Sequence, residues 1–172
     1  LNRFPEHNNA GLATYKMGLV YLEMGDYQQA ETFFGNILQD DRDASLKHLA
    51  RIGQARTALT QVLFDQAKRY LNTVLNSASS EIAAEAQFLL GKTAEQAGDC
   101  ETAVVEYLKT KYLYGGEKEW VKKSVFNAAE CNETLEKYGD ARRLYRSIIQ
   151  DFPGDTTYAN QAEERLNALA GE

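Results

Sequence analysis

The sequence predicts an all-α fold, an α-solenoid of four helix pairs followed by a C-terminal capping helix. Two columns of small residues recur with a period of about 37 residues, and a column of bulky residues keeps the same register. Only two prolines occur, at positions 5 and 153, so the strongest helix breaker is absent between them. No alternating β-branched run or Asn-Gly turn predicts a strand.

Small residues set the register of the repeat. The first column is Gly18, Ala55, Gly91 and Ala129, and the second, twelve residues later, is Ala30, Ala67, Ala103 and Ala141. A bulky residue follows four positions after each second alanine: Phe34, Leu71, Tyr107 and Tyr145. Small residues at fixed points allow two helices to approach closely where they cross, and the bulky residue fills the space beside the crossing.

Tight turns separate the two helices of a pair. In Met24-Gly25-Asp26 and in Ala97-Gly98-Asp99, the glycine supplies a positive φ and the aspartate caps the next helix. The second repeat has Val62-Leu63-Phe64-Asp65 and no glycine, so its turn departs from this pattern.

These signals give the helix limits. First helices are expected near 9–24, 43–60, 80–97 and 119–135, and second helices near 27–39, 64–76, 100–113 and 138–151. A ninth helix is expected at 156–170. Asn9, Asp43, Ser80 and Asp155 are the expected caps of their helices. We therefore expect a single solenoid over 1–172, with repeats at 9–42, 43–79, 80–116 and 117–154 and a cap at 155–170.

The two ends of the sequence differ. Phe4-Pro5 matches Phe152-Pro153 at the end of a second helix, so we expect a fragment of a longer protein with another repeat upstream. The first helix has a broad apolar surface that includes Leu12 and Leu19, which predicts self-association through the N-terminal repeat. Tyr158, Ala162, Leu166 and Leu169 form one stripe on the ninth helix, as in a helix that closes a solenoid.

Composition excludes several classes of function. The net charge of −6 argues against a nucleic-acid partner, which needs a basic surface. No apolar run is long enough to span a membrane. Cys100 and Cys131 have no metal-binding spacing and are expected to be unjoined, with Cys100 the more exposed of the two.

No catalytic constellation is present, so we expect neither an enzyme nor a bound cofactor or metal. His7 and His48 have no cysteine or carboxylate at a ligand spacing and are interpreted as surface histidines. Adjacent carboxylates such as Glu163-Glu164 diverge by about 100° around a helix and cannot hold one substrate atom.

Two segments resemble the tetratricopeptide-repeat family: Gly-Asp-Tyr-x-x-Ala-x-x-x-Phe at 25–34 and Tyr-Gly-Asp-Ala-x-x-x-Tyr at 138–145. The resemblance implies a right-handed superhelix that binds a protein or peptide in its concave groove. The closing segment 144–169 is similar to the ends of bacterial envelope proteins of this class, such as the Tol–Pal-associated periplasmic protein and the Bam-type lipoproteins. That likeness implies a periplasmic or envelope-associated scaffold.

Three rows of first-helix residues are candidates for the concave face. The first row, Tyr15, Ile52, Phe88 and Phe126, is bulky and apolar throughout and also fits an inter-repeat core. The other two rows are Leu19, Arg56, Lys92 and Glu130, and Leu22, Leu59, Glu95 and Glu133. Both change from apolar to charged along the chain, which fits either a partner with an apolar and a polar end or drift on a solvated surface.

The predicted partner-binding residues are Tyr15, Leu19, Leu22, Arg56, Leu59, Lys92, Glu95, Lys123, Glu130 and Glu133. Lys123 and Asn127 would be only a remnant of the carboxylate clamp that some tetratricopeptide modules use. Trp120 is either an aromatic anchor for a partner or a staple folded back on Tyr112 and Leu113, and the second interpretation is favoured.

The favoured function is thus a non-catalytic scaffold of the bacterial envelope. The alternative is a peptide-sensing or regulatory arm of a multidomain enzyme or transcription regulator. A signal peptide or lipobox upstream would favour the first, and a helix-turn-helix or catalytic domain the second.

Overall fold

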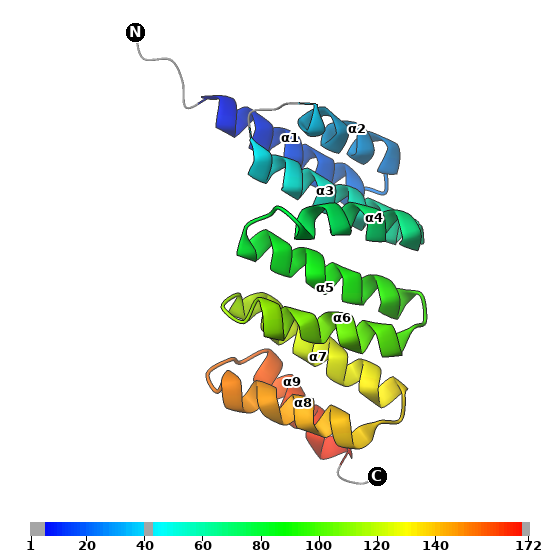
Figure 1. Cartoon of the computed structure of the whole chain (residues 1–172), viewed down its shortest axis with the longest axis vertical. Helices are drawn as coiled ribbons and strands as arrows, with labels where there is room; N and C mark the ends of the chain where they lie inside the picture. Colours follow the sequence, from blue (N-terminus) through cyan, green and yellow to red (C-terminus); the bar gives the residue numbers. More distant parts are fainter. Residues whose placement is uncertain (1–5, 40–42, 170–172) are drawn as a thin grey trace. The chain divides into compact units, whose positions relative to one another are not determined.

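The computed structural model describes residues 6–39 and 43–169, with side chains from residue 10 to 39 and from 43 to 169, and these residues form helices joined by turns (Figure 1). The first pairs are α1 (Glu6–Glu23) with α2 (Tyr27–Leu38) and α3 (Ala44–Thr60) with α4 (Phe64–Leu75). They are followed by α5 (Ser80–Gln96) with α6 (Cys100–Leu113), α7 (Lys118–Thr134) with α8 (Tyr138–Asp151), and α9 (Tyr158–Ala168). The predicted all-α architecture of helix pairs with a final single helix is confirmed. Phe4-Pro5 lies outside the described residues.

The helices belong to two compact units. Unit 1 spans residues 1–82 and contains α1 to α4, and unit 2 spans residues 83–172 and contains most of α5 together with α6 to α9. Each unit has apolar clusters in which the first helix of one pair packs on the second helix of another. Phe34 of α2 meets Ala50 of α3 in unit 1, and Tyr107 of α6 meets Ala128 of α7 in unit 2.

The crossing register follows the small-residue columns. All four alanines of the second column and all four bulky residues after them are fully buried. Gly18 is small because a Cβ there would lie 2.5 Å from the ring of Phe34, and a Cβ at Gly91 would collide with the ring of Tyr107 in the same way. The glycines therefore make room for the aromatic ring of their own repeat.

The turns of the four pairs share one backbone conformation. Gly25 and Gly98 have φ of 78° and 81°, as predicted, and the next residues cap α2 and α6. The corresponding residues of the other two pairs, Val62 and Glu136, also adopt positive φ, of 62° and 58°. The second turn therefore keeps the common geometry without a glycine, at the cost of a left-handed β-branched residue.

We expect Val62→Gly to raise the free energy of unfolding by about 1 kcal/mol, since glycine adopts positive φ without a Cβ clash. Val62 is 65% exposed, so its side chain contributes little packing. Urea denaturation measures the change. The matched control is Val105→Gly, at an exposed position inside α6, which should instead destabilise by roughly 0.5–1 kcal/mol. Equal losses in both variants would contradict a strained turn.

Three helix starts differ from the predicted caps. Asp43 caps α3 as expected, accepting a 3.0 Å hydrogen bond from the Leu46 amide. Asn9 is not a cap, because α1 begins three residues earlier, and Ser80 is the first residue of α5 rather than a residue before it. Asp155 is not the N-cap of α9, because the helix begins later than predicted and Thr157 is its N-cap. The Oδ1 of Asp155 still accepts hydrogen bonds from the amides of Thr157 and Tyr158.

Candidate protein-binding face

The first helices of unit 2 form a continuous polar face, which we call the α5–α7 face. The phenol of Tyr107, a buried residue of α6, donates a short hydrogen bond to Glu95 on α5 and accepts one of 3.2 Å from Asn127 on α7. One repeat later, the phenol of Tyr145 donates a 2.5 Å hydrogen bond to Glu133 on α7. Burial and the adjacent carboxylates raise the pKa of both phenols, so they stay protonated as donors.

These tyrosine–glutamate pairs give a packing cause for the apolar-to-charged change along the third row. In unit 1, Leu22 packs against the cluster that contains Phe34, and Leu59 is buried, as is Leu71 of its own repeat. Each residue of the third row is therefore suited to the bulky residue twelve positions later in its own repeat. A leucine precedes an apolar bulky residue, and a glutamate precedes a tyrosine. Pairing within each repeat is enough to produce the gradient.

Charged groups of the α5–α7 face form one cluster. Lys92 pairs with Glu95 at 3.1 Å, and Arg165 of α9 donates two hydrogen bonds to Glu133, of 3.0 and 2.9 Å. Glu130 lies among them, and its carboxylate makes no hydrogen bond or ion pair with the described residues. Four of the predicted site residues, Lys92, Glu95, Glu130 and Glu133, are thus brought together. Arg165 is a fifth member of the cluster and is not among the residues predicted from the sequence.

The carboxyl of Glu130 has a raised pKa. Partial burial is the main cause, and the neighbouring carboxylates of Glu95 and Glu133 raise it further, while Arg165 and Lys92 act in the opposite direction. Glu130 is nevertheless an exposed residue. The face therefore presents an accessible carboxylate whose negative charge is poorly compensated.

The candidate residues of unit 1 mostly serve packing. Tyr15, Leu19 and Leu22 are half-buried against the cluster around Phe34. Leu59 is only 7% exposed and belongs to the core, which leaves too little surface for contact with a partner. Arg56 is half-buried. The polar part of the candidate face therefore lies in unit 2.

Trp120 packs, but not on the residues expected. Its ring lies 5.5 Å from that of Phe88, and the ammonium of Lys123 stands 4.7 Å above it. Tyr112 and Leu113, the predicted partners of the staple, are 78% and 65% exposed. Trp120 thus joins α7 to α5, with Lys123 over its ring as a cation–π partner.

The two cysteines and His48 are the described residues most suited to covalent or acid–base chemistry, and they serve packing or hydrogen bonding. Cys100 and Cys131 are free, as predicted, but both are buried, which corrects the expected exposure of Cys100. They also share one apolar cluster, and burial together with the Cys100 thiol raises the pKa of Cys131. His48 bonds Ser77 at 2.9 Å. Within the described residues no set of side chains is suited to hold a metal ion.

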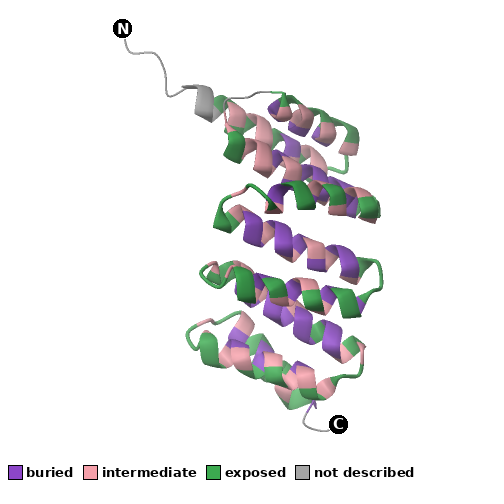
Figure 2. Cartoon of the chain, in the orientation of Figure 1, coloured by how far each residue is buried: buried purple, intermediate pink, exposed green. Residues whose placement is uncertain are grey.

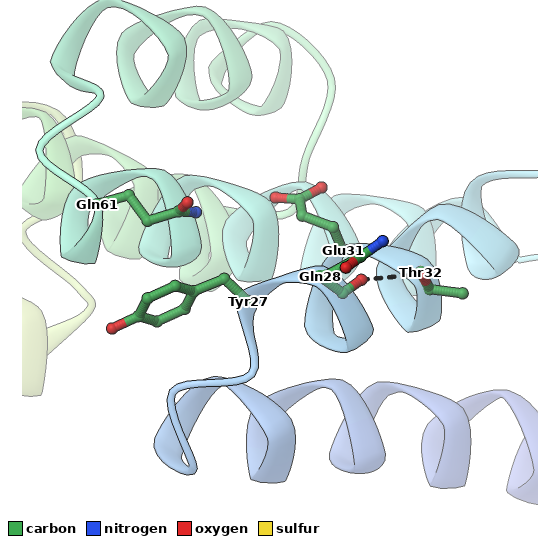
Figure 3. Close-up of a pocket in the computed structure, with 5 residues that line it drawn as sticks. All are labelled: Tyr27, Gln28, Glu31, Thr32 and Gln61. Atoms are coloured by element: carbon green, nitrogen blue, oxygen red, sulfur yellow. Dashed lines mark hydrogen bonds between the residues drawn. The ribbon is translucent and has the colours of Figure 1, made fainter.

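A shallow pocket of about 490 Å³ lies beside α2 in unit 1 (Figure 3). Its lining residues are Tyr27, Gln28, Glu31, Thr32 and Gln61. Burial raises the pKa of Glu31, whose carboxylate accepts a 2.8 Å hydrogen bond from Gln54. The polar groups of these lining residues can donate or accept hydrogen bonds.

Comparison with known families agrees with the geometry. Two models described as tetratricopeptide repeat match the chain, one over residues 52–110 and the other at 12–44 and again at 123–155. The chain is built of tetratricopeptide repeats, which generally mediate protein–protein interaction and typically serve as non-catalytic scaffolds. The comparison with curated proteins gives no match. No helix in the described part of the chain is both long and apolar enough to cross a membrane.

Proposed function

We propose that this chain is a non-catalytic scaffold that binds a partner protein or peptide on the α5–α7 face, with Glu130 receiving a lysine or arginine of the partner. The observation that supports this most is the exposed residue Glu130, whose carboxyl pKa is raised by partial burial and, to a smaller extent, by Glu95 and Glu133. A cation from a partner would compensate this charge. Because this cation is present only when the partner is bound, its attraction to Glu130 favours the complex over the free chain.

The surrounding residues give the site a fixed geometry. Tyr145 and Arg165 hold Glu133 from two sides, and Tyr107 with Lys92 holds Glu95. Because these carboxylates are already engaged, Glu130 is the acceptor left for an incoming cation. The carboxylates beside Glu130 are thus preorganised and lose little side-chain entropy when a partner binds.

Glu130→Gln tests the proposal because the amide keeps the shape and removes the charge. Binding is measured on a peptide array in which every lysine- or arginine-containing peptide has a counterpart with glutamine in place of the cation. We expect the unchanged chain to prefer cationic peptides, and Glu130→Gln to weaken this binding by about 10-fold or more. Glu163→Gln, on an exposed part of α9 outside the cluster, should bind as the unchanged chain does. Identical binding by the two variants would refute the assignment.

The same variant should stabilise the free chain at neutral pH. A raised pKa means that the fold favours protonated Glu130, so ionisation lowers stability as pH rises through the folded-state pKa. Glu130→Gln removes that loss. Its advantage in free energy of unfolding should therefore be seen at pH 7 and vanish as pH falls toward the ordinary value of 4.5. A destabilised variant at pH 7 would show that the charge is compensated within the fold.

The proposed setting is the bacterial cell envelope, where the scaffold would work in the periplasm. Support comes from the resemblance of residues 144–169 to the ends of envelope proteins. The full gene sequence and fractionation of cells expressing its product test this. Recovery in the cytoplasm, with a helix-turn-helix or catalytic domain upstream, would favour the regulatory arm instead.

A further inference from the structure

One side of α1 is apolar and uncovered by the described residues. We call it the α1 stripe. It consists of Ala10, Ala13, Met17 and Val20 of α1 and of Met24, the residue directly after the helix, whose amide donates a hydrogen bond to the Val20 carbonyl. Their spacing of three and four residues places them on one side of the helix. All five are exposed, and Met17, Val20 and Met24 are 43%, 48% and 72% exposed. Among the residues of α1 whose burial is described, Gly18 alone is buried. It directly follows Met17 and so points about 100° away from it around the helix. Figure 2 colours each described residue of the chain by its burial.

The equivalent stripe on other first helices is a helix-packing surface. In α3, the residues 37 positions after Ala13, Met17 and Val20 are buried: Ala50, Gln54 and Thr57. Ala50 shares an apolar cluster with α2, and Gln54 donates a hydrogen bond to Glu31 of α2. In α7, the corresponding residues Ser124, Ala128 and Cys131 are also buried, and the last two pack against α6. The α1 stripe thus occupies the repeat positions that, in α3 and in α7, pack against a second helix.

The composition of the α1 stripe defines the second helix that it can accept. The side chains of its N-terminal half, Ala10 and Ala13, are small, and those of its C-terminal half, Val20 and Met24, are larger. Met17 lies midway between the ends. An identical helix running antiparallel, with a two-fold axis at Met17, would place each alanine against a larger side chain of the other copy. Such a surface is complementary to itself.

We propose that a second copy of this chain packs on the α1 stripe, with the two α1 helices antiparallel. The stripe extends for roughly 21 Å, at about 1.5 Å per residue. One helix of this length buries less than the about 800 Å² per partner of a standard interface. The dimer is therefore weak and forms at high protein concentration. The stripe lies in unit 1 and shares no residue with the α5–α7 face, so the dimer is independent of Glu130.

Sedimentation equilibrium over a range of concentrations tests the dimer. Met17→Glu places a charge at the two-fold axis in both copies, so its dissociation constant should rise about 100-fold. The control is Val105→Glu, a substitution at a comparably exposed valine of α6, which should leave the dissociation constant unchanged. Urea midpoints of both variants should match that of the unchanged chain, because both sites are exposed. Leu19→Glu is a poorer test, since Leu19 packs against the core of unit 1.

Cross-linking tests the symmetry. In an antiparallel pair centred on residue 17, Met17→Cys brings two thiols together across the axis, and oxidised glutathione should join them as a disulfide-linked dimer. Cys100 and Cys131 are buried and give little background. Tyr112→Cys, at a more exposed site on α6, is the control and should stay unlinked at the same concentration. A strict monomer at all concentrations, a dimer insensitive to Met17→Glu, or equal cross-linking of both variants would each overturn the proposal.

Discussion

Replacing Phe34 with alanine should lower the free energy of unfolding by about 3–5 kcal/mol, as measured by urea denaturation. The ring of Phe34 is fully buried and fills the space at two glycines, Gly18 of α1 and Gly53 of α3. Neither glycine has a side chain that could move into the cavity. The loss should therefore lie at the upper end for a large-to-small substitution, since the cost depends on how far the site can collapse.

Phe33→Ala is the matched control, since it removes the same side chain one residue earlier. Phe33 is half-buried, and its ring stacks on that of Tyr21 at 5.2 Å. Its removal should cost about 1–2 kcal/mol, from partial burial and one aromatic pair. If both variants lost the same stability, the crossing register assigned to α2 would be wrong.

This register could be predicted from sequence because it depends on steric size. Gly18 and Gly91 must be small for a ring to pass, and Ala30 and Ala103 must be small for the helices to cross. Size is a property of the residue itself, so it can be seen in a column of one-letter codes. The repeat period then places every helix to within a few residues.

The turns show where that reasoning fails. Val62 and Glu136 disfavour positive φ, yet both adopt it. The packed helix pairs on either side require the chain to reverse in the same way in each repeat, and their burial outweighs a local cost of about 1–2 kcal/mol. A glycine marks this conformation where it is present. Its absence does not exclude it, and Gly139, which suggests a turn, lies inside α8.

The candidate face was partly predictable. Aligning each glutamate of the third row with the residue twelve positions later would have shown that Glu95 and Glu133 are followed by tyrosines, which can donate to them. Arg165 could not be found in this way, because it reaches Glu133 from α9, 32 positions away and outside the repeat register. Trp120 likewise packs on a ring 32 positions earlier in the sequence.

Asp155→Ala should lower the free energy of unfolding of unit 2 by about 2–4 kcal/mol, because one carboxylate has two roles. Its Oδ1 accepts hydrogen bonds at 3.0 and 2.6 Å from the amides of Thr157, the N-cap of α9, and of Tyr158, the first residue of that helix. Its Oδ2 pairs at 2.5 Å with Lys122, a lysine only 8% exposed. Removing the carboxylate leaves that ammonium with Glu119 as its remaining ion-pair partner among the described residues.

Asp155→Asn separates the two roles, since the asparagine oxygen can also accept hydrogen bonds from these backbone amides but carries no charge. We expect it to recover about 1 kcal/mol of the loss. Asp151→Asn, which breaks the ion pair between Lys111 and Asp151 on the surface, is the control and should cost less than about 1 kcal/mol. Equal losses for Asp155→Asn and Asp151→Asn would mean that burial adds nothing to the Lys122 pair.

The pH dependence identifies the ion pair independently. Lys122 and the amide of Tyr158 lower the pKa of Asp155, so its contribution to stability is present above the ordinary value of 3.8 and is lost as pH falls through the folded-state pKa. Asp155 and Glu119 raise the pKa of Lys122, whose contribution is full below 10.5 and is lost as pH rises through the folded-state pKa. The stability difference between the unchanged chain and Asp155→Asn should therefore stay constant between pH 3.8 and 10.5 and shrink on either side. A difference that already disappears near pH 6 would mean that another group titrates at this contact.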